Sequence, residues 1–437
     1  MTKYIIAILT FSMNFIAVSQ TTSLEDLLNF ANTNSPEIQN ASIDVEIAEQ
    51  KIKEYTSAGL PKINGSLDFQ NFINIPTTVI PASAFGLPTN ELMPVKFGTD
   101  YNSNLSLRLD QLIFSARYIY GIRAANAYAD LTQLIKKQKL AEFKEKISTL
   151  YYSILLINKN ILLTQKSKEQ IKKIFDYTQK MVKEGFLELN QLDEITLLLL
   201  QLENAVDQLK MNEELSLIQL KSNIGYPIDS ALNLEDNFSE IVNSAAGISK
   251  NINANQTISY MLASQNTILS DLDLKVVKSE GYPSLSGFVN HQEMAMREEF
   301  NFLNGRLPWY PATVWGVRVN IPIFNSGEGK SKRTQKELGL LKSQNDLINI
   351  ESQISALLIQ LENNSKFSKI SLKNAQESLI FAEKVLENEI LKYKSGTSSV
   401  LLVSQAQNQV ISAQQVLLKK EFNVITSQLA INKIINP

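Results

Sequence analysis

The chain of 437 residues contains no cysteine and a single histidine, His291. Without cysteine there is no disulfide framework, no thiol chemistry and no cysteine to carry a lipid anchor. One histidine without cysteines or a second histidine does not form a zinc site. The sequence also lacks a glycine-rich phosphate loop, so energy for any active process must come from a partner. We therefore expect no catalytic residues, no cofactor and no metal site.

An excess of charge of one sign is also absent. Lysine and arginine together number 42 and aspartate and glutamate 44, which leaves a formal net charge of −2. Proteins that bind nucleic acid usually carry a basic surplus or a basic patch, because they neutralise phosphates. The composition therefore argues against a nucleic-acid partner.

Long apolar runs are missing beyond the first residues of the chain. Lys3 precedes an apolar run from Tyr4 to Val18 that ends in Ala17-Val18-Ser19, a small-x-small cleavage pattern. This arrangement predicts a secretory signal peptide over residues 1–19. The alternative is an N-terminal membrane anchor, for which the run is short against a bilayer span of about 20 residues. If the mature chain crosses a lipid bilayer, it must do so by another element.

Proline is absent from two long stretches, between Pro94 and Pro227 and between Pro322 and Pro437. Since proline in a helix interior costs about 3 kcal/mol, both stretches can form long helices. Apolar residues recur there at steps of three and four, which is the seam of a coiled coil. The seam residues include Ile147, Leu150, Ile154, Ile157 and Ile161, and later Val403, Ala406, Val410, Ala413 and Leu417. We predict two antiparallel helical hairpins that turn near Gly185 and Gly396.

The chain is internally duplicated. Gly59-Leu60-Pro61-Lys62-Ile63-Asn64-Gly65 returns as Gly281-Tyr282-Pro283-Ser284-Leu285-Ser286-Gly287, and Lys183-Glu184-Gly185 returns as Lys394-Ser395-Gly396. Repetition of this kind decides the architecture, because each copy carries the same order of elements. We predict a first repeat over 20–226, an equatorial linker over 227–256 that is rich in asparagine and serine, and a second repeat over 257–437.

Around the repeated glycine-proline signals the hydrophobic period changes to two. Apolar and polar side chains alternate in segments near 62–73, 101–114 and 312–324, and less regularly near 284–291, where Phe288 falls among the polar positions. A segment of about ten residues that is apolar on one side and polar on the other fits a strand of a membrane barrel. An ordinary half-buried sheet would show the same alternation.

Four features favour the membrane interpretation. The chain carries an export signal, it has no other membrane element, aromatic residues lie along or at the ends of the strands, and long loops separate the strands of each pair. Under this interpretation the lipid-facing residues are Leu105, Leu107, Leu109, Trp315, Val317 and Val319. Two strands per repeat give four per chain, too few for a closed barrel, so we predict a homo-oligomer, with a trimer favoured over a dimer.

This arrangement resembles the TolC-like outer membrane efflux family over almost the whole mature chain. The resemblance rests on Ser23-Leu24-Glu25-Asp26-Leu27-Leu28, on Asn34-Ser35-Pro36-Glu37, on the paired glycine-proline strand starts, on Pro322-Ile323-Phe324, and on Tyr393-Lys394-Ser395-Gly396 at the second hairpin turn. No one of these motifs is specific, but their order occurs twice. The family implies an α+β membrane protein with a 12-stranded trimeric barrel that continues as a long antiparallel α-helical coiled-coil tube.

The same resemblance implies partners and a resting state. Members of the family reach from the outer membrane across the periplasm to an adaptor protein and an inner-membrane pump, driven by protons or by ATP. Their helix tips close the tube at rest and open on docking. The residues that match the docking tips here are Gly185, Phe186, Leu187, Tyr393, Gly396 and Thr397. Structurally, the two glycines serve first of all as turn residues.

One departure from the family concerns the constriction. The family often places acidic residues shortly after the second tip glycine, where this chain has Leu402 and Gln405. The first tip is acidic instead, so our hypothesis places Asp193 and Glu194 at the narrowest point. The alternative is a solvated charged face at a helix start.

Taken together, the sequence predicts a passive exit duct in the outer membrane, in contact with outer-membrane lipid and extending into the periplasm. It does not reveal whether the exported compound is a drug, a metal ion, another small molecule or a protein. The alternative function is an exported coiled-coil scaffold or surface protein without channel activity, whose sheets never meet lipid.

Overall fold

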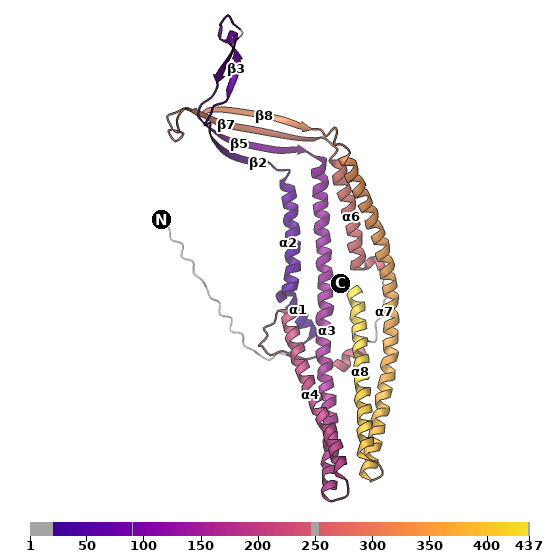
Figure 1. The fold of residues 1–437 in the computed structure, drawn as a ribbon. Helices are drawn as coiled ribbons and strands as arrows, with labels where there is room; N and C mark the ends of the chain where they lie inside the picture. Colours follow the sequence, from indigo (N-terminus) through magenta and orange to yellow (C-terminus); the bar gives the residue numbers. More distant parts are fainter. Residues whose placement is uncertain (1–20, 90, 246–252, 436–437) are drawn as a thin grey trace. The chain divides into compact units, whose positions relative to one another are not determined.

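The computed structural model describes residues 21–89, 91–245 and 253–435 (Figure 1). The predicted signal peptide over 1–19 and part of the predicted linker, residues 246–252, lie outside the described residues. The chain divides into two compact units, and each unit takes segments from both sequence repeats. Of the described residues, one unit contains 21–45, 132–245, 253–264 and 346–435, and the other contains 46–89, 91–131 and 265–345.

The duplication is visible in the lengths of the helices. The three helices that follow one another in the first repeat have counterparts of almost the same length in the second. These pairs are α2 (Pro36–Ser57) and α6 (Ile258–Ser279) with 22 residues each, α3 (Ala116–Lys183) with 68 and α7 (Glu328–Lys394) with 67, and α4 (Leu189–Ile224) and α8 (Val400–Ile435) with 36 each. The predicted pair of long helical hairpins is confirmed.

The first unit holds the hairpins and the described part of the linker. Helix α1 (Leu24–Asn34) begins with a capping box, in which Ser23 and Asp26 each accept a hydrogen bond from the backbone of the other. Its buried residues Leu27 and Ala31 join a core with Phe143 and Ile147 of α3. Helix α5 (Phe238–Ala245) contributes Phe238 and Val242 to the same core.

A strand pair and a hydrogen bond hold the linker against α3. The short strand β1 (Thr21–Thr22) pairs in parallel with β6 (Asn233–Leu234). The Tyr151 hydroxyl donates a hydrogen bond of 2.7 Å to Asp236 Oδ2. Burial, and then the hydrogen bond and charge of Asp236, raise the pKa of the Tyr151 phenol well above its usual range. Tyr151 therefore remains a neutral hydrogen-bond donor at physiological pH.

A buried ion pair joins α3 to α8. Lys159 Nζ lies 2.9 Å and 2.8 Å from the two carboxylate oxygens of Glu421. The same ammonium lies 3.2 Å from Ser239 Oγ and 5.5 Å from the ring centroid of Phe238, both on α5. One lysine thus connects both hairpins with the linker.

The second unit is built on one antiparallel sheet in the order β2-β5-β7-β8 (Figure 1). The strands are β2 (Lys62–Asn71), β5 (Tyr101–Phe114), β7 (Ser284–Arg297) and β8 (Tyr310–Asn320). The central pairing joins the two repeats, since β5 of the first repeat pairs with β7 of the second. Strands β2 and β8 form the two edges of this sheet.

Two strand ends differ from the sequence prediction by more than two residues. Strand β7 does not end at His291 but runs to Arg297, because it pairs with β5 up to Tyr101. Strand β8 ends at Asn320 rather than near residue 324, and Pro322 follows after one residue, Ile321. Proline has no N–H to donate, so a strand commonly stops before it.

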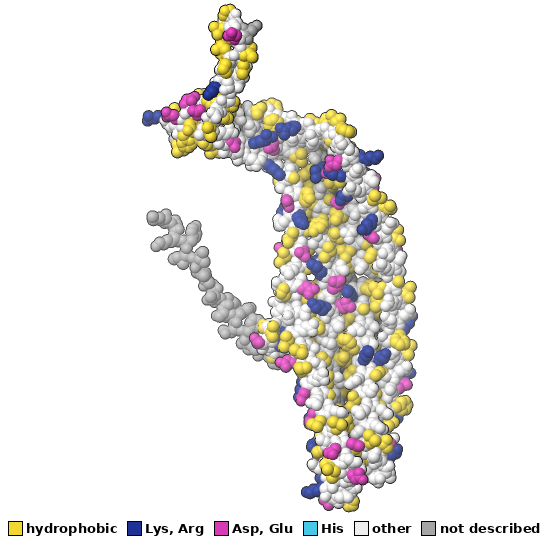
Figure 2. Space-filling model, viewed as in Figure 1, with side chains coloured by type: hydrophobic (Ala, Val, Ile, Leu, Met, Phe, Trp, Pro, Cys, Tyr) yellow, Lys and Arg dark blue, Asp and Glu magenta, His cyan; other side chains and the backbone are white. Residues whose placement is uncertain are grey.

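The loop between β2 and β5 contains a hairpin that the sequence analysis did not foresee. Strand β3 (Thr77–Pro81) pairs with β4 (Leu92–Lys96), and the 3-10 helix η1 (Ala82–Phe85) follows β3. Figure 2 shows hydrophobic side chains gathered over this hairpin. Val79, Phe85 and Leu92 are all exposed there.

Side-chain contacts join three helices in the second unit. The Gln265 side chain of α6 donates to the carbonyl of Ala127 in α3, and Lys336 of α7 pairs with Asp273 of α6 at 2.7 Å. Gly59, in the first glycine-proline signal, leaves room for the Tyr118 ring, which a Cβ atom at Gly59 would meet at 2.3 Å. Close packing therefore favours glycine at position 59.

In the described part of the chain, none of the helices combines the length with the apolar character needed to span a bilayer.

Candidate functional site: a two-faced sheet and two hairpin tips

The strand register sorts the sheet residues into two faces. Leu109 lies directly opposite Val289, and Val289 opposite Trp315. On the other face, Ser106 lies opposite Ser66 and Gln292. Because paired residues share a face and neighbours along a strand alternate, the apolar and polar sets predicted from the sequence fall on opposite sides.

The polar face carries one charged pair of the same strand, Arg108 and Asp110. Arg108 donates to the Asp110 carboxylate at 2.9 Å. Phe288, the residue that interrupts the alternation of β7, lies on this face between two guanidinium groups, with Arg108 at 5.3 Å and Arg318 at 5.5 Å from its ring centroid. The cation–π contacts explain an aromatic ring on a polar face.

The six residues predicted to meet lipid share the opposite face. These are Leu105, Leu107, Leu109, Trp315, Val317 and Val319. Trp315 is 77% exposed, and Leu105, Leu107, Val317 and Val319 are also exposed. Such a surface is costly in water, so something apolar should cover it. Their contact with lipid remains a prediction.

One polar cluster interrupts the apolar face. His291 Nδ1 lies 2.8 Å from Thr313 Oγ1, and His291 Nε2 lies 3.6 Å from a Glu293 carboxylate oxygen. Leu107 is directly opposite His291, and Leu105 is opposite Glu293. The sequence does not predict this cluster, because the alternation of β7 suggests a strand end at His291.

An aromatic cluster lies at the loop end of β2 and β5. The Phe69 ring centroid is 6.2 Å from Tyr101, 5.2 Å from Phe300 and 5.5 Å from Phe302, and Trp309 lies 6.3 Å from Phe302. Phe69 and Tyr101 share the face of Leu105 and Leu107. Aromatic girdles of this kind mark the interfaces of membrane barrels.

The two hairpin tips have the same backbone design. Gly185 and Gly396 have φ of 79° and 78°, the left-handed region that favours glycine. The next N–H bonds back across the turn, from Phe186 to the Met181 carbonyl at 2.8 Å and from Thr397 to the Lys392 carbonyl at 2.9 Å. This is the Schellman arrangement of a helix end.

Most of the predicted docking residues are accessible at the tips. Phe186 is 72% exposed, and Gly185, Gly396 and Thr397 are exposed as well. Leu187 is half-buried and packs against the core between the two hairpins. An exposed phenylalanine at a turn is the kind of side chain that anchors an interface.

The predicted docking role of Tyr393 requires a revision, because only 4% of the surface of this residue is exposed. Its hydroxyl lies 2.7 Å from Thr178 Oγ1, which itself donates to the Ile174 carbonyl at 2.9 Å. Tyr393 is therefore the donor and Thr178 the acceptor. Burial raises the pKa of Tyr393, which keeps the donating proton in place. Tyr393 joins the two hairpins and does not offer a docking contact in this conformation.

Glu389 stabilises the second tip. One carboxylate oxygen lies 2.7 Å from Lys392 Nζ, and the other accepts from Ser398 Oγ at 2.8 Å. The hydrogen bond to Lys392, and then that to Ser398, lower the pKa of Glu389. The stabilisation is therefore present above the ordinary pKa of a glutamate and is lost as pH falls through the lowered value.

Asp193 and Glu194 are exposed in the first turns of α4, just beyond the first tip. Leu402 and Gln405, the positions at which the family often has acids, are exposed just beyond the second tip. Whether Asp193 and Glu194 line a constriction remains a prediction.

Comparison with known proteins gives three sequence similarities. The pattern of the outer membrane efflux protein family matches residues 270–436. The outer membrane protein TolC of Salmonella enteritidis is 19% identical over 95% of this chain and 82% of its own length. The outer membrane efflux protein BepC of Brucella suis is 27% identical over 120 residues, a match that covers only 25% of BepC.

Solved structures share the fold over almost the whole chain. VceC, an outer membrane protein of Vibrio cholerae, has a TM-score of 0.74 at 13% identity and covers 94% of this chain and 95% of its own. The CmeC outer membrane channel of Campylobacter jejuni has a TM-score of 0.70 at 16% identity and covers 95% of this chain and 87% of its own. At these identities the likeness establishes the fold.

Proposed function

The chain belongs to the TolC-like outer membrane efflux protein family, and from this premise we propose that it forms a passive exit duct through the outer membrane. The family consists of outer membrane channels, and this protein is located in the outer membrane. The duct opens at its periplasmic hairpin tips when an adaptor and an inner-membrane pump dock there. The pump supplies the energy and selects the exported compound.

One observation carries this proposal, the four-stranded sheet with two unlike faces and two unpaired edges. Within the described residues, β2 and β8 pair on one side only. Unpaired strand edges cannot remain in lipid, where no water satisfies their backbone groups. Pairing β8 of one copy with β2 of the next removes both edges, with apolar residues outside and polar residues inside.

The number of strands in the sheet supports three copies over two. Two copies would give a barrel of eight strands, whose interior is largely filled by side chains, whereas three give twelve and leave a water-filled interior. The Arg108–Asp110 pair and Arg318 would then line that interior. We therefore propose a homotrimer.

Membrane fractionation followed by mass determination and planar-bilayer recording tests this proposal. We expect a trimer from the outer membrane that gives small and mostly closed conductances, because the tips are joined at rest. A water-soluble monomer or dimer without conductance would contradict it and would favour the scaffold alternative.

Docking at the tips can be tested at Phe186. A photo-crosslinking residue placed there should capture a periplasmic adaptor in cells, whereas the same residue at exposed Ile348, far from the turns along α7, should not. Equal capture at both positions would count against docking at the tips.

Removing the hydroxyl that joins the hairpins should make the duct open more often. Tyr393→Phe leaves the Thr178 hydroxyl without its donor. The contact between the two hairpins should lose about 0.5–1.5 kcal/mol of stabilisation per chain. We expect more frequent or larger single-channel openings. Tyr177→Phe is the matched control, because its hydroxyl reaches the Lys394 carbonyl only at 3.4 Å. An equal effect of both variants, or none, would remove Tyr393 from the closing mechanism.

The acidic constriction is tested by neutralising both acids. Three copies of Asp193 and Glu194 in one narrow ring would attract cations, so Asp193→Asn with Glu194→Gln should reduce the cation preference of the single-channel current. Asp207→Asn with Glu214→Gln, exposed on the same helix but remote from the tip, provides the control. Unchanged ion selectivity in the tip variant would place the constriction elsewhere.

A further inference from the structure

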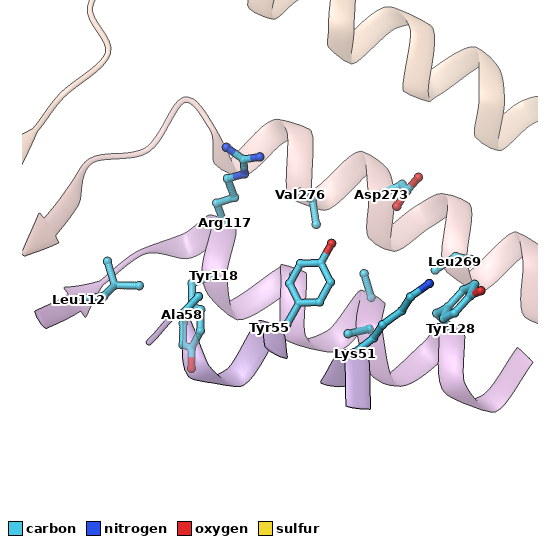
Figure 3. Close-up of a pocket in the computed structure, with 13 residues that line it drawn as sticks. Lys51, Tyr55, Ala58, Leu112, Arg117, Tyr118, Tyr128, Leu269, Asp273 and Val276 are labelled. Atoms are coloured by element: carbon cyan, nitrogen blue, oxygen red, sulfur yellow. The ribbon is translucent and has the colours of Figure 1, made fainter. Parts of the chain in front are cut away.

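We propose that a cavity beneath the sheet binds amphipathic aromatic anions on their way through the duct. The cavity has a volume of about 490 Å³ and lies among α2, α3 and α6, with Leu112 of β5 at one end (Figure 3). This volume falls in the range of sites for drug-sized ligands. The position of the cavity on the transport path rests on the proposed function, whereas its binding chemistry does not.

The sheet register indicates which side the cavity faces. Leu112 lines the cavity and lies directly opposite Ser286. Along β5, Leu112 shares the alternating face of Arg108 and Asp110, the polar face of the sheet. The cavity therefore opens on the side that the proposed duct turns toward its interior.

The floor of the cavity is made of small residues on α3, namely Gly121, Ala124 and Ala125. A glycine in a helix interior costs about 1 kcal/mol relative to alanine. Packing does not require glycine here, because a Cβ atom at Gly121 would meet only Tyr55 Cδ1, at an ordinary 3.9 Å. Gly121 therefore widens the cavity, and no packing contact within the chain depends on it.

Aromatic and apolar side chains form the walls. Tyr55 and Tyr128 are exposed at the cavity, although both are large rings that could have been buried (Figure 3). Tyr118 is fixed, since its hydroxyl donates to the Thr56 carbonyl at 2.9 Å. Leu269 and Val276 complete an apolar lining suited to a flat ring system.

The charge of the cavity selects an anion. Asp273 is neutralised by Lys336 at 2.7 Å, and Arg117 lies 3.6 Å from Glu280. Among the described residues, Lys51 has no carboxylate within ion-pair distance and rests 4.9 Å from the ring centroid of Tyr128. Lys51 is itself exposed, so its ammonium can make a charge-assisted hydrogen bond with an anionic group beside the ligand's ring.

Binding can be measured on the full protein in phosphatidylcholine nanodiscs by calorimetric titration with 2-naphthalenesulfonate. We expect saturable binding with one site per chain. Gly121→Leu should abolish it by filling the floor, and Lys51→Gln should weaken it by about tenfold, as expected for the loss of a charge-assisted contact. Neutral 2-naphthol and the cation 2-naphthylmethylammonium should bind more weakly than the sulfonate.

Two variants serve as controls for folding and for adsorption to the membrane. Lys53→Gln changes an exposed lysine on the same helix outside the cavity, and Gly339→Leu places the same side chain at a helix glycine with nothing within 4 Å. Both should bind the sulfonate like the unchanged protein. Absence of saturable binding, or equal binding by Gly121→Leu, would overturn the site. Equal affinity for the cation would overturn the assignment to anions.

The titration also separates this inference from the proposed function, because it needs no transport. Binding without any channel conductance would support the site and count against the duct. Conductance without binding would support the duct and remove the site.

Discussion

An arginine at Leu109 should prevent the protein from accumulating in the outer membrane. Leu109 lies in the apolar row with Ile63, Val289 and Trp315. If this row faces lipid, Leu109→Arg costs about 2–4 kcal/mol per chain, and three chains carry it together. We expect little or no trimer in outer-membrane fractions, measured by immunoblot of unheated and heated samples.

The matched control is three residues away on the same strand. Ser106→Arg places the same side chain on the polar face, opposite Ser66 and Gln292. It loses the 2.8 Å hydrogen bond between the Ser106 and Ser66 hydroxyls but would meet water inside the proposed barrel. We expect an amount close to that of the unchanged protein. Similar losses in both variants would show that the two faces do not have the assigned environments.

Loss of Lys159 should destabilise the first unit, which holds the hairpins, more than loss of any exposed lysine. Its partner Glu421 has a side chain only 7% exposed, and the lysine itself is 23% exposed. Lys159→Met leaves a buried carboxylate without a counter-charge, which costs about 3–5 kcal/mol. We expect a clear fall in the denaturant midpoint of the purified protein, followed by circular dichroism.

Two further variants separate the pair from general damage. Lys159→Met combined with Glu421→Leu should recover much of the stability, since the unpaired charge is gone. Lys139→Met breaks the 3.0 Å pair with Asp44, in which both side chains are about half exposed, and should cost only about 0–1 kcal/mol. If Lys159→Met behaved like Lys139→Met, the buried pair would have no special part in holding α3, α8 and the linker together.

The helices and the duplication were predictable from the sequence because they depend on local rules. The absence of proline from the stretch after Pro94 permits α3, and the left-handed backbone at Gly185 ends it, so the length of the hairpin follows from composition. The alternation around Leu107 and Val317 likewise assigns two faces, since the period of a strand is two.

The extent of β7 could not be predicted because strand pairing is not local. His291 and Glu293 interrupt the apolar pattern, and the sequence therefore suggested an end at His291. The structure continues the strand because the backbone of β5 offers pairing partners as far as Tyr101. Backbone hydrogen bonds are satisfied regardless of which side chain the residue carries.

What the sequence by itself determined is the order, period and length of the elements, and hence the helical hairpins, the two-faced strands and the tip glycines. Only the tertiary structure decided which side chains meet. It buried Tyr393 against Thr178, joined Lys159 to Glu421 across 262 positions of the chain, and brought Lys51 and Gly121 to one cavity. Periodicity fixes the face on which a residue lies, whereas contacts depend on the packing of elements that are distant in sequence.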